Sequence, residues 1–116
     1  MTHIHLLRAV LLLLPLSLAA CTIVDETAQT PTTCDVHHVA MKRDTVPIAY
    51  GDRVFDPRYA AAAERGFPYA NLESRRGCVV ESDSPTHARV LYCPECRKAE
   101  AAFVREREQQ QQQRAK

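Results

Sequence analysis

Cysteine and histidine are the residues of this 116-residue chain whose types and spacing could do chemistry. Two pairs are each separated by two residues, Cys34 with His37 and Cys93 with Cys96. This spacing lets both side chains of a pair converge on one ion while backbone amides face the sulfur atoms. The four residues are therefore predicted to hold a structural Zn²⁺ that is closed to solvent.

Two further residues compete for places in this site, because His38 lies beside His37 and Cys78 offers another thiol. Disulfide bonds are the alternative interpretation. Bridges such as Cys34 to Cys78, or Cys78 to Cys93 or Cys96, would staple a small core equally well. The sequence leaves zinc and disulfides open.

A different functional class is an envelope thiol-redox or copper-handling protein. The motif Cys93-Pro94-Glu95-Cys96 has the spacing of thioredoxin-like dithiols, although the expected strand-helix-strand context is missing. Cys34, His37 and Met41 offer a thiolate, an imidazole and a thioether, which suit copper. A lone methionine in a strand is more often part of a core, so both interpretations rank below zinc.

Neither catalysis nor nucleic-acid binding has support in the sequence. The three glycines form no phosphate-binding loop, and there is no Ser-His-Asp order or paired-carboxylate motif. Arg8 is the only charged residue before Cys21, and without it the basic residues balance the 14 acidic ones. A nucleic-acid binder usually carries a basic excess on one face. We therefore expect a non-enzymatic binding or scaffolding module that does not bind nucleic acid.

The first 20 residues are predicted to be a signal peptide, with Arg8 followed by an apolar run. That run is about 12 residues long, whereas a transmembrane helix needs roughly 20. The segment ends in Leu18-Ala19-Ala20-Cys21, which resembles the lipobox of bacterial lipoproteins. This resemblance implies cleavage before Cys21, diacylglycerol on its thiol, and commonly a further acyl chain such as palmitate on its amine.

The same resemblance places the protein in the cell envelope, anchored to a membrane by lipid. Thr22, rather than aspartate, follows the lipid site, which in Gram-negative lipoproteins favours the periplasmic side of the outer membrane. Export also carries the remaining cysteines into an oxidising compartment.

The mature chain is predicted to form one small α+β domain over residues 34–105. Residues 21–33 are expected to be the lipidated cysteine and a flexible tether, because they are polar and lack periodicity. Residues 39–50 favour an edge strand, or two short strands broken at Pro47. A short helix should begin at the N-cap Asp56, with Pro57 in its first position, and stop at Gly66.

A β-hairpin and a long helix complete the predicted domain. Residues 78–81 and 88–92 look like two strands joined by a turn. Helix-forming residues continue from Cys93 to the end of the chain, and residues 106–116 form a polar, glutamine-rich tail available to a protein partner. The chain thus has a first ligand pair (Cys34 and His37), then a hairpin, then a second pair (Cys93 and Cys96) in the opening turn of a helix. This order resembles treble-clef and ribbon-type zinc modules.

A wider pattern covers most of the mature chain and resembles a group of small bacterial proteins without an assigned activity. The resemblance implies a shared fold and a shared metal site, but no reaction or ligand. The segments that carry it are Cys34-x-x-His37, Val46-Pro47-Ile48-x-Tyr50-Gly51, Phe67-Pro68, Gly77-Cys78-Val79 and Cys93-Pro94-x-Cys96.

Overall fold

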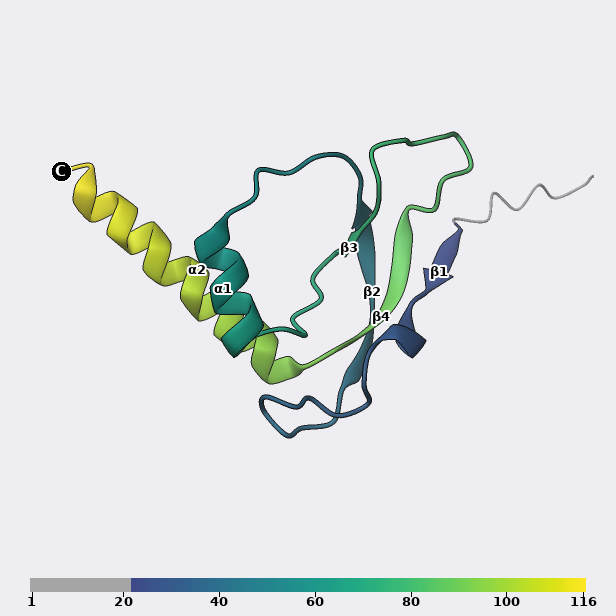
Figure 1. Ribbon diagram of the computed structural model, residues 1–116, viewed down its shortest axis with the longest axis horizontal. Helices are drawn as coiled ribbons and strands as arrows, with labels where there is room; N and C mark the ends of the chain where they lie inside the picture. Colours follow the sequence, from purple (N-terminus) through teal and green to yellow (C-terminus); the bar gives the residue numbers. More distant parts are fainter. Residues whose placement is uncertain (1–21) are drawn as a thin grey trace, which may run out of the picture.

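The computed structural model describes residues 22–116, which form a four-stranded sheet with two helices beside it (Figure 1). The small α+β class, with a long C-terminal helix, is confirmed. The strand order is β1-β4-β2-β3. The elements are β1 (Ile23–Asp25), the 3-10 helix η1 (Thr27–Gln29), β2 (Lys42–Ala49), α1 (Pro57–Gly66), β3 (Ser74–Arg75), β4 (His87–Tyr92) and α2 (Pro94–Arg114).

The predicted signal peptide, residues 1–20, and the predicted lipid site, Cys21, lie outside the described residues. Within residues 22–116, no helix combines the length and the apolar character needed to span a membrane.

β2 is one continuous strand inside the sheet, so both expectations, an edge strand and two short strands broken at Pro47, are wrong. It pairs antiparallel with β4, with Pro47 opposite His87, and its parallel pairing with β3 begins at Ile48. The Ile48 amide donates to the Thr86 carbonyl at 2.9 Å. Consecutive strand amides face opposite ways, so the Pro47 nitrogen faces away from β4. The missing donor therefore removes no hydrogen bond to β4, and proline is tolerated.

The predicted hairpin is also wrong in one of its strands. β4 forms as expected, but residues 78–81 form no strand, and Val79 and Val80 are 75% and 61% exposed. Both edges of β4 are already occupied, one by β1 and the other by β2. Residues 78–81 therefore have no free edge of β4 to pair with.

The folded part begins earlier than the predicted domain. β1 lies inside the segment expected to be a tether and pairs in parallel with β4, with Ile23 opposite His87. Just beyond β1, the Glu26 carboxylate accepts hydrogen bonds from Ser74 Oγ at 2.9 Å and from Arg76 at 2.7 Å. Backbone pairing and the hydrogen bonds of Glu26 hold β1 in place. Its three residues are too few to show a strand pattern in the sequence.

α1 follows the capping signals read from the sequence. The Asp56 carboxylate accepts the backbone amides of Arg58 and Tyr59, Pro57 occupies the first position, and the helix ends at Gly66. Asp56 also forms an ion pair with Arg107 of α2 at 2.6 Å. The Tyr59 amide, together with Arg107, holds the pKa of this carboxyl below its usual value. One residue thus caps α1 and ties it to α2, which lies alongside it in Figure 1.

The buried core is small and is centred on sulfur. Its main cluster contains Phe67 and Ala70 with three cysteines, and Phe103 packs against it from α2. A separate, smaller cluster lies on the sheet around Val46, Ala88 and Val90. The largest fully buried side chains are Cys34, Cys93 and Cys96.

Arg97 connects the first turn of α2 to the rest of the domain. Its guanidinium donates to the carbonyl oxygens of Ala70 at 2.8 Å and Asn71 at 3.0 Å, and to the Asp44 carboxylate at 2.7 Å. It also lies 3.5 Å from the centre of the Tyr92 ring. These contacts fix the start of α2 against β2, β4 and the loop that follows α1.

Replacing this side chain, Arg97→Ala, should lower the free energy of unfolding by about 2 kcal/mol, because two partly buried carbonyls lose a charged donor. The Asp44 pair contributes little to that figure, since the carboxylate is 41% exposed. Denaturant unfolding measures the change. The neighbouring Lys98→Ala, which removes only an exposed pair with Glu95, should leave stability nearly unchanged. Equal effects of the two substitutions would contradict this role for Arg97.

Candidate metal centre

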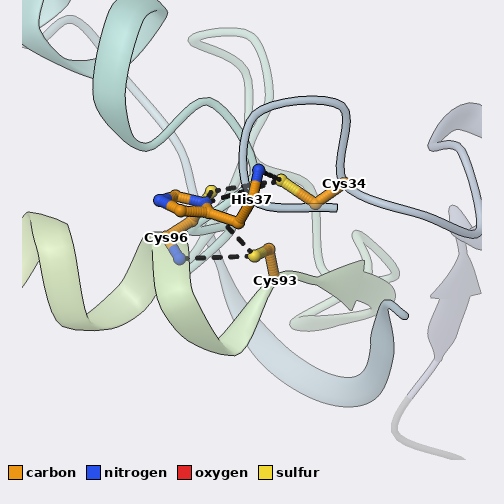
Figure 2. Close-up of side chains that lie close together, drawn as sticks. All are labelled: Cys34, His37, Cys93 and Cys96. Carbon is orange, nitrogen blue, oxygen red and sulfur yellow. Dashed lines mark hydrogen bonds between the residues drawn. The ribbon is translucent and has the colours of Figure 1, made fainter. Parts of the chain in front are cut away.

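The structure brings together the four residues that the sequence singled out first. The ligand atoms of Cys34, His37, Cys93 and Cys96 all lie within 4.8 Å of one another. Figure 2 shows their side chains pointing toward one another from two separate parts of the chain. The first pair lies in the loop before β2, and the second lies where β4 ends and α2 begins. The cluster therefore joins the N-terminal part of the fold to α2.

Four of the six distances between the ligand atoms are close to those expected of a tetrahedral metal site. A zinc ion with bonds of about 2.3 Å to sulfur and 2.0–2.1 Å to nitrogen places two sulfurs about 3.8 Å apart, and sulfur and nitrogen about 3.6 Å apart. The sulfurs of Cys34 and Cys96 are 3.8 Å apart. His37 Nδ1 lies 3.6 Å from the Cys34 and Cys93 sulfurs and 3.3 Å from the Cys96 sulfur. A disulfide would instead require about 2.05 Å between sulfurs.

The first pair of candidate ligands, Cys34 and His37, lies in a tight loop, the first knuckle, which is closed by backbone hydrogen bonds. The Cys34 amide donates to the Val39 carbonyl at 2.9 Å, and the His38 amide donates to the Cys34 carbonyl at 2.8 Å. The His37 amide faces the Cys34 sulfur at 3.4 Å. The backbone reverses direction at His38, whose φ of 56° lies in the left-handed region. The loop thus directs His37 to the sulfur cluster and leaves His38 exposed.

The second pair of candidate ligands, Cys93 and Cys96, forms the second knuckle, which is also the start of α2. Cys93 is the N-cap residue, and its sulfur accepts the Cys96 amide at 3.3 Å. Pro94 takes the first helical position, where its missing amide hydrogen is not needed. The positive end of the helix dipole lies at this turn and favours a thiolate. The predicted helix start and the second cysteine pair are therefore one structural feature.

Burial and hydrogen bonding shift the pKa values of two thiols of the cluster, Cys34 and Cys96, in opposite directions. Burial raises the pKa of Cys96 to about 12. Burial also acts against ionisation of Cys34, but the backbone amide and the ring of His37 outweigh it and lower the pKa of that thiol to about 7. All three cysteines of the cluster have 0% exposure. A cation at their centre would stabilise the thiolates that burial alone disfavours.

The alternative ligands lie elsewhere. His38 is exposed, and Cys78 is exposed with its sulfur 3.5 Å from the Asp52 carboxylate. All four cysteines in residues 22–116 are free, so this part of the chain contains no disulfide. Met41 packs against the main hydrophobic cluster as a partly buried side chain.

Residues outside the two motifs complete the surroundings of the site. The Tyr69 carbonyl accepts the Cys93 amide at 2.9 Å, and the Tyr69 backbone also hydrogen-bonds to Cys96. Phe67 and Ala70 are buried in the same cluster as the cysteines. The Tyr69 contacts use backbone atoms, so no residue type could have shown them.

In a comparison with known proteins, no family model, curated protein or solved structure matches the chain. The chemistry of the site therefore rests on its own atoms. Three thiols and one imidazole whose ligand atoms lie within 4.8 Å of one another can hold a metal ion with four protein ligands.

Proposed function

We propose that this protein is a membrane-anchored lipoprotein whose folded domain is a binding or scaffolding module stabilised by zinc. The observation that carries the proposal is the convergence of the Cys34, Cys93 and Cys96 sulfurs and His37 Nδ1 within 4.8 Å of one another. The lipid anchor is proposed from the lipobox-like sequence that ends at Cys21.

Zinc fits this donor set better than copper does. Three thiolates and one imidazole form a common structural zinc site, and the spacing between these donors matches tetrahedral zinc bonds. Copper handling was inferred from Met41, which has a packing role against the hydrophobic cluster. Zinc would also supply what the core lacks, because a domain of this size rarely gains more than about 3–5 kcal/mol from its hydrophobic core.

A structural role follows from the number of protein ligands. Catalytic zinc sites usually keep one position for water or substrate, whereas four protein ligands close the coordination sphere. We therefore propose a non-enzymatic module. The second half of α2 extends beyond the rest of the fold (Figure 1), and residues 108–116 are exposed. This polar tail supports a role in contacting a protein partner.

Metal and thiol analysis of the full-length protein tests the zinc site. The protein is extracted from membranes without chelator, and its bound metals and reactive thiols are counted. We expect one zinc per chain and one readily alkylated thiol, that of exposed Cys78. After denaturation in the presence of chelator, Cys34, Cys93 and Cys96 should react as well.

Each rival interpretation gives a different result in the same experiment. Disulfide bonding gives folded, metal-free protein whose cysteines in the cluster stay unreactive after denaturation. A copper-handling protein gives stoichiometric copper that is lost in the Met41→Ala variant. A redox protein gives metal-free protein with a dithiol that oxidises and reduces reversibly. Any of these results would contradict the zinc proposal.

The affinity for zinc should fall as the pH falls, because protons compete with the metal for the sulfur atoms. The thiol of Cys96, with a pKa of about 12, must release a proton at any pH near neutrality. Cys34, with a pKa of about 7, must do so only below about pH 7. Cys34 should therefore steepen the loss of affinity below pH 7 by up to about tenfold per pH unit. Competition with a chelator at several pH values measures this, and a pH-independent affinity would contradict it.

A further inference from the structure

Two loops that leave the same end of the sheet carry strongly exposed apolar side chains. Val54 and Phe55, in the loop between β2 and α1, are 98% and 76% exposed. Val79 and Val80, in the loop between β3 and β4, are 75% and 61% exposed. Large apolar side chains so exposed in adjacent loops are a feature of interaction surfaces.

The two loops are bound to each other at one end of the sheet. The Gly51 amide donates to the Gly77 carbonyl at 3.3 Å, and the Tyr50 hydroxyl donates to the Pro85 carbonyl at 2.6 Å. Figure 1 shows both loops beyond the end of the sheet at which β1 begins. We call residues 50–56 and 77–86 together the apolar loop end.

The chain enters the fold at this same end. Ile23, the first residue of β1, pairs with His87, which directly follows the second loop. Ile23 is itself 46% exposed. Cys21 precedes Ile23 by two residues, so their Cα atoms are at most about 7 Å apart. A lipid on Cys21 would therefore hold the membrane close to the apolar loop end.

We propose that the apolar loop end docks directly onto the surface of the lipid bilayer. This inference rests on the proposed lipidation of Cys21. In the docked state, Val54, Phe55, Val79 and Val80 enter the interfacial region of the bilayer, where apolar side chains are stabilised and water is displaced. The acyl chains supply most of the anchoring, and the loops fix the orientation of the domain.

The charges near the apolar loop end indicate that apolar contact drives the docking. Arg53 and Arg75 both pair with Glu73, and Arg76 pairs with Glu26. Within the apolar loop end itself, the acidic residues outnumber the one basic residue, Arg53; they are Asp52, Asp56, Glu81 and Asp83. Docking should therefore occur on zwitterionic lipid as well as on anionic lipid.

Docking in this way directs the metal centre away from the membrane. The apolar loop end follows the last residue of β2, whereas Lys42, the first residue of β2, lies at the end where the metal centre is found. The strand spans roughly 23 Å at 3.3 Å per residue. The start of α2, with the metal centre, then lies on the side of the domain away from the membrane.

Tryptophan fluorescence tests the proposal, because the natural chain contains no tryptophan. Full-length lipidated Phe55→Trp and Val79→Trp proteins are reconstituted into phosphatidylcholine vesicles with brominated acyl chains, which quench only tryptophan that enters the bilayer. The matched control is Lys42→Trp, exposed at the opposite end of β2. We expect strong quenching and blue-shifted emission for both loop variants, and neither change for the control.

The outcomes separate this inference from the proposed function. Mass spectrometry that finds Cys21 unmodified would overturn both. Lipidated, vesicle-bound protein whose loop variants are quenched no more than Lys42→Trp would overturn the docking alone. A blue shift that needs no lipid and grows with protein concentration would show that a second copy covers the loops, and would also overturn it.

Discussion

The Cys96→Ser variant is expected to lose its metal and most of its stability. A serine hydroxyl is a poor zinc ligand, and it would leave two buried thiols without the fourth ligand that completes the tetrahedron. Because a core this small supplies at most about 3–5 kcal/mol, and the variant also loses the metal that joins two distant segments around buried thiols, we expect it to be largely unfolded at 37 °C. Metal content and the amide region of the circular dichroism spectrum measure the two effects.

Cys78→Ser is the matched control, since it makes the same change at an exposed cysteine outside the cluster. It should keep its zinc and unfold at the same temperature as the natural protein. Adding excess chelator to the natural protein should reproduce the unfolding seen in Cys96→Ser. A Cys96→Ser variant that unfolds as cooperatively and at the same temperature as Cys78→Ser would contradict a structural metal.

The second large effect is expected from Cys21→Ser, which removes the thiol proposed to accept diacylglycerol. Without the lipid, the precursor should not be processed before residue 21, and its mass should lack the acyl chains. Two or three acyl chains anchor a protein firmly, whereas none of them remains in this variant. We expect metabolic labelling with a palmitate analogue to fall to background.

The control for that experiment is again Cys78→Ser, because it tests whether any exposed thiol could carry the label. It should incorporate the palmitate analogue as the natural protein does. If Cys21→Ser were still labelled, cleaved and extracted from membranes like the natural protein, the lipoprotein assignment would be wrong. Zinc binding by the folded domain would be unaffected by that result.

The metal ligands could be predicted because their signal is local. Two intervening residues place Cys34 and His37 on one side of a tight loop, and they place Cys93 and Cys96 on the first turn of a helix. The caps of α1 and α2 are local for the same reason. What the spacing could not give was the choice between zinc and disulfides, which depends on how two distant segments meet. The structure shows that the Cys34 and Cys96 sulfurs are 3.8 Å apart, which is too far for a disulfide between them.

The strand pairing could not be predicted because it depends on competition between segments. Residues 78–81 have the composition of a strand, but β1 and β2 occupy both edges of β4. β1 has only three residues and is held by backbone pairing and by the contacts of Glu26. Pro47 suggested an edge, yet its nitrogen faces the side of β2 where pairing with β3 starts one residue later. Each of these features is a property of the assembled sheet.

We propose a lipid-tethered domain in which one metal ion joins the loop before β2 to the start of α2. X-ray absorption at the zinc edge of the natural, full-length protein tests this most directly. We expect three sulfur neighbours at about 2.3 Å and one nitrogen neighbour at about 2.0–2.1 Å. A protein without zinc, or one whose zinc has fewer than three sulfur neighbours, would contradict the assignment of Cys34, His37, Cys93 and Cys96.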